Sequence, residues 1–332
     1  CSSDLSLVCY KPGNVMYPGS AYCGDVVVED IAMPQEIIAK SNGNEVMDDD
    51  LIASFLPKRQ AHSNKGSYGK ALMIGGSMRM HGALAMCAKA ALSSGIGTLT
   101  IALPSSIHAI MAGKMEECML LPLSDEDGYF SEKSAEELKD QLDLFDFVTI
   151  GNGMGRGKGA NALVELVLKS NLPCILDGDA LYLVGKHPEW LKRKAPTILT
   201  PHPKEMSYLS ARKLDDVLND PMEVVQTFLK GYGNITLIYK NEHTIVCNKA
   251  FSYMNLAGNN ALAKGGSGDV LCGMLCGLYG QSKDALKSAC CAVYVHARCA
   301  DELIKAKDYN AILAKDIIEE SSHIYKELRN RQ

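Results

Sequence analysis

Residues 258–275 read GNNALAKGGSGDVLCGML, and this stretch gives the clearest indication of the fold. The small residues at positions 265–268 let the backbone curl until consecutive N–H groups converge on one point. The apolar run at residues 270–275 predicts a helix that starts directly behind them. Helix N-termini offer unpaired N–H groups and a positive dipole end, so in an α/β sheet such a loop binds anions. The stretch therefore predicts an α/β protein with an anion site here.

Upstream of this stretch, short apolar runs alternate with helical patterns. Runs without polar alternation, typical of parallel strands covered on both faces, occur at residues 71–74, 98–103, 147–150, 174–176, 197–199 and 236–239. Helical patterns lie between the first of these runs, at residues 83–94 and 105–112. We therefore expect an α/β fold with a mostly parallel, doubly wound sheet and helices on both faces.

The chain divides into three segments by composition. Residues 1–37 contain turn signals and a β-branched run at residues 26–28, but they are too few for a domain of their own. Residues 38–50 are mostly polar, so we expect a linker. The main domain is expected at residues 51–330.

Composition limits the class of function. The 332 residues carry a net charge of −5 and a pI near 5.9, which argues against general affinity for nucleic acid or anionic membranes. No apolar run reaches the length of about 18 residues that a membrane-spanning helix needs. The twelve cysteines form no CxxC pair, so we expect reduced thiols and a cytoplasmic location. Cys272 and Cys276 share a helix face without a further ligand pair, and we predict core packing rather than a metal site.

Asp269 closes the glycine loop. A carboxylate at this point can take a proton from a hydroxyl while the loop N–H groups stabilise charge on a transferring phosphoryl group. The pair predicts a phosphotransferase site. The alternative is a plain glycine turn in which Asp269 only favours the first helical turn through the dipole.

Other motifs fail on spacing. A nucleophile elbow needs glycine two residues after Ser267, where the chain has Asp269. No Gly-Lys pair is followed by serine or threonine, which excludes a P-loop. The string at residues 151–159 approaches a dinucleotide fingerprint, but the third glycine is replaced by Arg156 or Lys158, depending on the starting glycine.

Two further strings contain candidate ligand contacts, and one predicted helix contains a histidine. In TPHPKE (residues 200–205), two prolines fix the backbone, so His202 is expected to project from a strand end before a helix that begins at about Lys204. It is a ligand contact or an ordinary loop histidine.

The string KNEHT (residues 240–244) joins two β-rich runs and is a ligand loop or a plain hairpin turn. His296 lies on an apolar helix stripe, and we predict a hydrogen-bonded core residue.

Together these strings resemble the NAD(P)H-hydrate dehydratases, a family of the ribokinase-like superfamily. The resemblance spans residues 51–328 and rests on GGS with Gly82 and Ala83, GNGMG, LDGDAL, TPHPKE and GNNALAKGGSGDVLCG. It implies a ribokinase-like fold and a metabolite-repair enzyme that uses ATP or ADP. Because a divalent ion usually bridges the phosphate oxygens in phosphoryl transfer, we also expect Mg²⁺. The substrate would be (6S)-hydrated NADH or NADPH, the hydroxyl of which is phosphorylated before phosphate is eliminated. Relatives also suggest a homo-oligomer.

The resemblance also implies roles for individual residues. Asp269 would be the catalytic base and a substrate contact. The other substrate contacts would be Ala83, Gly153 and His202. The nucleotide would be held by Lys240, Asn241, Glu242, His243, Thr244, Gly265, Gly266, Ser267 and Gly268. The family usually has glycine where this chain has Lys204 and Asn241, so contacts there are expected to differ, and alanine at Gly178, where no effect on the chemistry is expected.

The N-terminal segment resembles the closing strands of the epimerase domain that often precedes this dehydratase. We expect a remnant without epimerase activity, from a truncated or cleaved bifunctional protein or a family member that lost its first domain. Two alternatives to the main hypothesis stay open. One is a small-molecule kinase of the same superfamily, such as a hydroxyethylthiazole kinase, which would stop at a phosphorylated alcohol. The other is a non-catalytic adenine-nucleotide-binding protein, which would not need the Asp269 carboxylate.

Overall fold

The apolar runs form the strands that the sequence predicts, in a computed structural model that describes residues 3–38 and 44–332. The main sheet has ten strands in the order β3-β14-β13-β12-β11-β10-β9-β4-β5-β6. Their bounds are β3 (Asn44–Val46), β4 (Lys70–Ile74), β5 (Thr98–Pro104), β6 (Met119–Leu123), β9 (Phe147–Ile150), β10 (Cys174–Leu176), β11 (Thr197–Leu199), β12 (Ile235–Tyr239), β13 (Ile245–Cys247) and β14 (Ser252–Met254). Only the β12–β13 and β13–β14 pairs of this sheet are antiparallel. The predicted α/β class is confirmed.

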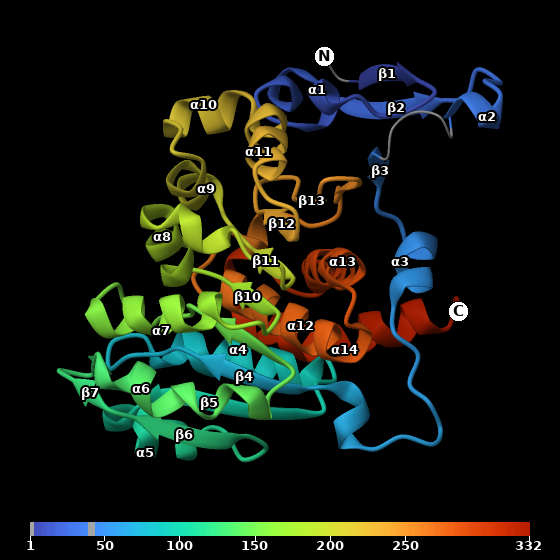
Figure 1. The fold of residues 1–332 in the computed structure, drawn as a ribbon. Helices are drawn as coiled ribbons and strands as arrows, with labels where there is room; N and C mark the ends of the chain where they lie inside the picture. The colour runs from blue at the N-terminus through green and yellow to red at the C-terminus, as the bar shows by residue number, and fades with distance from the viewer. Residues whose placement is uncertain (1–2, 39–43) are drawn as a thin grey trace.

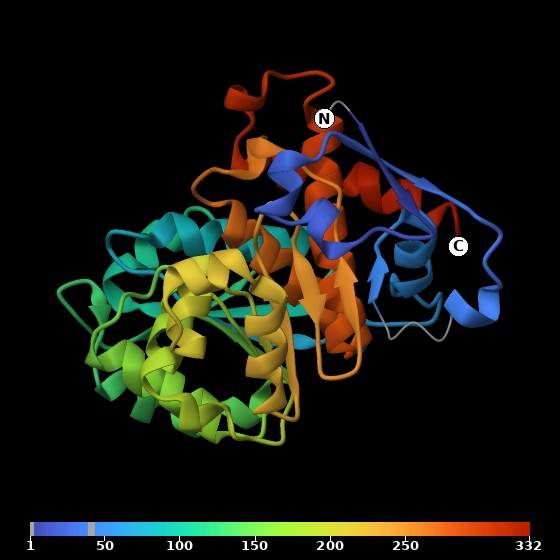
Figure 2. The same ribbon diagram turned by 90° about the horizontal axis from the view of Figure 1, so that it is seen from above.

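Helices cover both faces because strand residues alternate between two cores. Within β4, Ala71 and Met73 join one core, whereas Leu72 and Ile74 join the other. The first core is covered by α3 (Asp49–Phe55), α4 (His81–Ser93), α5 (His108–Ala112), α12 (Ser267–Ser282), α13 (Ala285–Leu303) and α14 (Ala314–Arg329). The second is covered by α6 (Lys133–Lys139), α7 (Lys158–Lys169), α8 (Asp179–Lys186), α9 (Pro203–Ser210), α10 (Leu214–Asn219) and α11 (Pro221–Lys230). Figures 1 and 2 show these layers, with α12–α14 in orange and red and α7–α9 in green and yellow.

The strand order reverses between β4 and β9. From β4 the chain continues to β5 and β6 on one side, and from β9 it continues to β10, β11 and β12 on the other. Ligands of doubly wound sheets bind in the crevice at such a switch point. The loops after these two strands meet there, because Gly76 N donates to Asn152 O at 2.8 Å. The topology thus places the GGS and GNGMG strings side by side.

Part of the expected linker belongs to the sheet. Residues Asn44–Val46 form β3, which pairs in parallel with β14 in the register Tyr253↔Glu45. The polar stretch can do this because an edge strand is held by its backbone hydrogen bonds on one side and can expose polar side chains. Asp48 then caps α3 by accepting from Leu51 N at 2.8 Å. The rest of the predicted linker at positions 39–43 lies outside the described residues.

The N-terminal segment forms a small parallel sheet of its own, of β1 (Ser3–Leu7) and β2 (Asp25–Glu29), with short helices α1 (Pro12–Val15) and α2 (Gln35–Ile38). In Figure 1 it lies at the top of the view, to the right of α10. Val15 and Met16 pack into the second core, whereas Leu5 and Val27 are exposed. The predicted strand at residues 26–28 is confirmed within β2. A hairpin of β7 (Asp125–Glu126) and β8 (Tyr129–Phe130) was not predicted.

No helix in the described part of the chain combines the length and the apolar character needed to cross a bilayer.

Candidate active site

The glycine loop ends in the first turn of α12. Gly266, which precedes the helix, has φ of 94°, a left-handed conformation that favours glycine. A Cβ here would also lie 2.6 Å from Met86 Cε. None of the described side chains caps this helix; Ser267 N donates to Lys264 O at 3.3 Å, and the N–H groups of Gly268 and Asp269 stay available to an anion. The local geometry is therefore that of an anion site.

Asp269 lies in this first turn, and its side chain is held from the switch point. Asn152 Nδ2 donates to Asp269 Oδ1 at 2.8 Å. Burial, followed by the charge of the nearby Asp177 carboxylate, raises the pKa of Asp269 to about 6, against the opposing effect of the Asn152 hydrogen bond. A carboxylate with this pKa can accept a proton near neutral pH and release it again, as a general base must.

Asp177 follows β10 and connects two parts of the site. It contacts Asn152, which holds Asp269, and Lys240, which lies in the loop between β12 and β13. Its Oδ1 accepts from Lys240 Nζ at 2.9 Å, and its Oδ2 accepts from Asn152 Nδ2 at 2.9 Å. Burial disfavours the charge on Lys240, but attraction from Asp177 and Glu205 outweighs it and raises the lysine pKa. Lys240 is thus a fixed cation beside the glycine loop: a Cβ on Gly268 would lie 3.5 Å from its Nζ.

His202 lies between β11 and α9, where the proline-framed string places it, and its side chain caps α9, a role that was not predicted. Its Nδ1 accepts from the backbone N–H groups of Lys204 (3.2 Å) and Glu205 (3.4 Å), which leaves the ring proton on Nε2. Burial lowers the pKa of His202, so the ring is neutral at neutral pH. Glu205 Oε2 accepts from His202 N at 2.9 Å, and burial raises the pKa of Glu205 to about 7. His202 can therefore donate a hydrogen bond without carrying charge.

A cavity of about 710 Å³ opens beside these groups. It is lined by His202, Lys240, Asn241, Glu242, His243, Thr244, Ser267, Gly268 and His296, together with residues of the loop at positions 255–264. The hairpin loop between β12 and β13 thus faces the start of α12. The volume is in the range of small-molecule sites.

The remaining predicted residues lie around this cavity rather than on its wall. Gly265 and Gly266 belong to the loop that leads into α12 and do not line the cavity. Ala83 and Gly153 lie against each other at the switch point, since a Cβ on Gly153 would be 3.2 Å from Ala83 Cβ. Asn152, the neighbour of Gly153, holds Asp269. Ala83 and Gly153 therefore lie at the switch point, on the side of Asn152, whereas His202 shares the cavity with the predicted nucleotide contacts.

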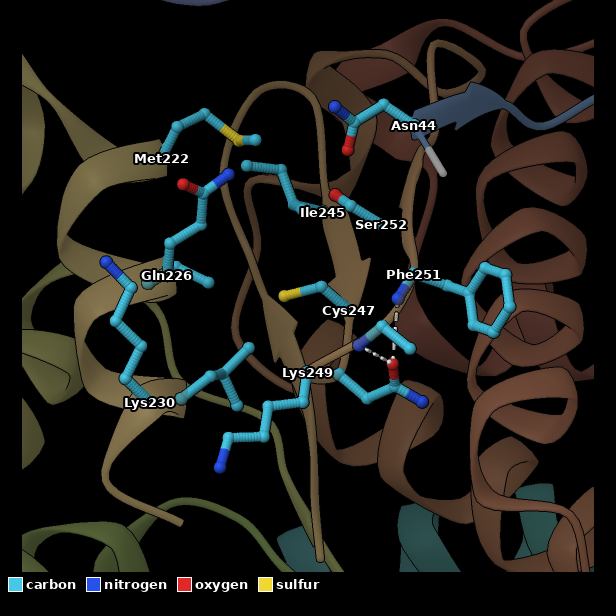
Figure 3. Close-up of a pocket in the computed structure, with 13 residues that line it drawn as sticks. Asn44, Met222, Gln226, Lys230, Ile245, Cys247, Lys249, Phe251 and Ser252 are labelled. Carbon is cyan, nitrogen blue, oxygen red and sulfur yellow. Dashed lines mark hydrogen bonds between the residues drawn. The ribbon is translucent and has the colours of Figure 1, made fainter. Parts of the chain in front are cut away.

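A second cavity of about 370 Å³ lies elsewhere, between α11 and the β13–β14 hairpin (Figure 3). Met222 and Gln226 of α11 face Ile245 and Cys247 across it. None of the residues predicted for the site lines this cavity. Its lining contains lysines and amides but no acid, so it offers no base for proton transfer.

Some functional contacts were not predicted. The strings containing Asn152 and Glu205 were recognised, but no role was assigned to either residue. His296 is buried and hydrogen-bonded, as expected of a core residue, with Nε2 3.2 Å from Ser267 Oγ. It also lines the cavity, which the apolar pattern of its helix could not predict. Burial lowers its pKa to about 4, so it supports Ser267 as a neutral ring.

The fold is that of an α/β protein of the ribokinase-like class. A solved ribokinase-like superfamily protein from Enterococcus faecalis matches with a TM-score of 0.76 and 24% identity, over 86% of this chain and 97% of the other, and supports the fold. The ADP/ATP-dependent NAD(P)H-hydrate dehydratase of Bacillus subtilis, co-crystallised with ATP and Mg²⁺, matches with a TM-score of 0.75 and 26% identity, over 87% and 99% of the chains.

The sequence comparisons place the chain more narrowly. The family model described as NAD(P)H-hydrate dehydratase matches residues 71–323. The chain belongs to the NAD(P)H-hydrate dehydratase family. A bifunctional NAD(P)H-hydrate repair enzyme of Moorella thermoacetica is 31% identical over 329 residues, which is 96% of this chain and 61% of that protein. The chain thus spans about three fifths of the length of such curated relatives.

Proposed function

We propose that this chain is an ATP- or ADP-dependent dehydratase that restores NADH and NADPH from their (6S)-hydrated forms. The observation that carries the proposal is Asp269: a half-buried carboxylate with a pKa of about 6, in the first turn of an uncapped helix, next to Gly268, which lines a cavity of about 710 Å³. Membership of the family, together with the relatives named above, supports the choice of substrate.

In this proposal Asp269 takes the proton of the C6 hydroxyl. The hydroxyl oxygen then attacks the terminal phosphoryl group, and the bond from phosphorus to the nucleotide breaks. The N–H groups at the start of α12 and the Lys240 ammonium stabilise the phosphate charge. The C6–O bond breaks next, its electron pair leaves with phosphate, and a proton leaves the neighbouring ring carbon to restore the double bond. Phosphate is a far better leaving group than hydroxide.

Mg²⁺ belongs to the nucleotide in this scheme. Among the described residues no group of three or more His, Cys, Asp or Glu side chains could hold a metal ion. In this proposal a divalent ion arrives on the phosphate oxygens of the nucleotide.

The decisive assay mixes purified chain with hydrated NADPH and either ATP or ADP, and follows recovery of the dihydronicotinamide absorbance. We expect recovery with at least one nucleotide, together with release of phosphate in equal amount. Accumulation of a phosphorylated hydrate without recovery would instead identify a kinase. Absence of both products, with nucleotide binding retained, would identify a binding protein.

We also propose that the segment up to residue 37 is the end of an epimerase-like domain. Its two strands form a parallel pair with exposed apolar side chains such as Leu5 and Val27, whereas parallel sheets are normally covered on both faces. We expect this 332-residue chain not to interconvert the two hydrate epimers. Interconversion above the spontaneous rate would contradict this. The homo-oligomer that the resemblance implies and the cytoplasmic location expected from the cysteines are part of the same proposal.

A further inference from the structure

Asn152 lies in the loop after β9 and contacts two carboxylates. One is Asp269 in the first turn of α12, and the other is Asp177, which pairs with Lys240 of the loop between β12 and β13. The side-chain nitrogen of Asn152 donates to Asp269 Oδ1 at 2.8 Å and to Asp177 Oδ2 at 2.9 Å. Its side-chain oxygen accepts from the thiols of Cys87 at 3.5 Å and Cys272 at 3.4 Å. These contacts use both donors and both acceptor sites of a primary amide. The side chain is 2% exposed, so water does not compete for them.

The surroundings leave the amide one orientation. If the amide were flipped, its oxygen would face two carboxylates and its NH₂ would face two thiols. Oxygen against carboxylate is repulsive, and thiols are weak acceptors. The four contacts come from three separate parts of the fold: Cys87 on α4, Cys272 and Asp269 on α12, and Asp177 after β10. Asn152 is therefore held in place by the packed helices, independently of any ligand.

The two carboxylates have different partners besides Asn152. Asp177 is neutralised by Lys240 Nζ at 2.9 Å and also accepts from Thr200 Oγ1. For Asp269 Oδ1 the hydrogen bond described is the one from Asn152. The Asn152 amide thus lies between two carboxylates and donates one N–H to each. It orients Asp269, while its other N–H is bound to Asp177, which is paired with Lys240.

We propose that Asn152 is the positioning residue for Asp269: it holds Oδ1 so that Oδ2 faces the substrate hydroxyl, and it ties this orientation to the lysine of the nucleotide loop. The inference rests on the proposed function of Asp269 as the base. The direction of the Asp269 titration agrees with it, because burial and Asp177 raise the pKa while the Asn152 hydrogen bond lowers it. Loss of the amide should therefore raise the pKa of Asp269 above about 6.

The test compares Asn152→Ala and Asn152→Asp with wild-type enzyme. In Asn152→Ala we expect kcat with hydrated NADPH to fall about 10- to 100-fold at neutral pH, the usual effect of losing a hydrogen bond to a charged group. The acid limb of the kcat/KM profile should move to higher pH, and the nucleotide Kd should change less than about threefold. Asn152→Asp keeps the shape but places a third carboxylate in the cluster, so the limb should move further.

Thr149→Val is the matched control. Thr149 lies on β9, the strand that leads into Asn152; it is fully buried, and within the described part of the chain its hydroxyl has no hydrogen-bond partner. Its acid limb should coincide with that of wild type. An unshifted limb in both Asn152 variants, while wild-type enzyme turns over hydrate, would overturn the positioning role and leave the proposed function intact.

A readout without turnover separates the two proposals. The ¹³C NMR titration of the Asp269 carboxyl, assigned by its loss in Asp269→Asn, reports the pKa directly. We expect a higher pKa in Asn152→Ala and Asn152→Asp than in wild type, whatever the substrate proves to be. An unchanged pKa in both variants would overturn the inference. An inactive wild-type enzyme with the expected pKa increase would count against the proposed function alone.

Discussion

At the scale of single residues, the account depends on where Asp269 titrates. Burial and the Asp177 charge raise its pKa to about 6, so it is protonated and inactive as a base below that pH. We expect kcat/KM to be level above about pH 7 and to fall tenfold per pH unit below about pH 6. A profile measured from about pH 5 to pH 8 checks this.

The neighbour that could produce a similar limb is Glu205, the pKa of which is raised to about 7 by burial. Glu205→Gln removes that titration but leaves Asp269 in place. The limb near pH 6 should persist in this variant, with or without a lower plateau. A limb that disappears in Glu205→Gln, or a wild-type limb near pH 4, would contradict the assignment to Asp269.

The residue scale also marks what the sequence could not reveal. Asp269, His202 and the KNEHT loop stand in recognisable strings, because the chemistry of glycine turns and proline-framed histidines is local. The role of Asn152 is not local. Its partners lie 25, 65, 117 and 120 residues away along the chain, so only the strand order brings them together.

At the scale of elements, the site depends on how closely α12 approaches α4. Gly273 lies at the contact, where a Cβ would be 2.1 Å from the backbone oxygen of Cys87. A side chain there must push the two helices apart. The start of α12 carries Asp269, so the same contact that packs the core also sets the position of the base.

We expect Gly273→Ala to lower the free energy of unfolding by about 1–3 kcal/mol, the usual range for overpacking a core. Gly265→Ala is the control, because a Cβ there would meet no atom within 4 Å. Its free energy of unfolding should stay within about 0.5 kcal/mol of wild type. Chemical denaturation measures both, and equal values for the two variants would contradict the packing argument.

The strands of the main sheet show which sequence patterns predict a strand and which do not. Fully apolar runs such as Cys174–Leu176 become central strands, because a strand covered on both faces needs apolar side chains in both directions. The polar run Asn44–Val46 becomes an edge strand, because backbone pairing with β14 fixes it without such a requirement. Hydrophobic periodicity therefore identifies the centre of this sheet but not its edge.

At the scale of the whole molecule, the cavity joins distant parts of the chain. Its wall combines the loop after β12, the loop at residues 255–264, and the helices α12 and α13. A nucleotide that bridges these parts binds only the folded chain. We expect ADP or ATP at about 100 times its Kd to add about 2.7 kcal/mol to the free energy of unfolding.

Thermal unfolding with and without nucleotide measures this effect, and inorganic phosphate alone serves as the control for simple anion binding. Phosphate should stabilise the chain less than the full nucleotide, because it does not reach the apolar wall formed by residues such as Leu271 and Val293. Equal stabilisation by the two, or none by the nucleotide, would contradict the assignment of the cavity.

The central claim is that Asp269 removes the proton from a substrate hydroxyl while the start of α12 holds the phosphate of the nucleotide. Asp269→Asn tests it most directly, since the amide keeps the size of the side chain but cannot act as a base. Turnover of hydrated NADPH should fall by about 10³-fold, with the nucleotide Kd nearly unchanged. Turnover close to that of wild type would contradict the claim.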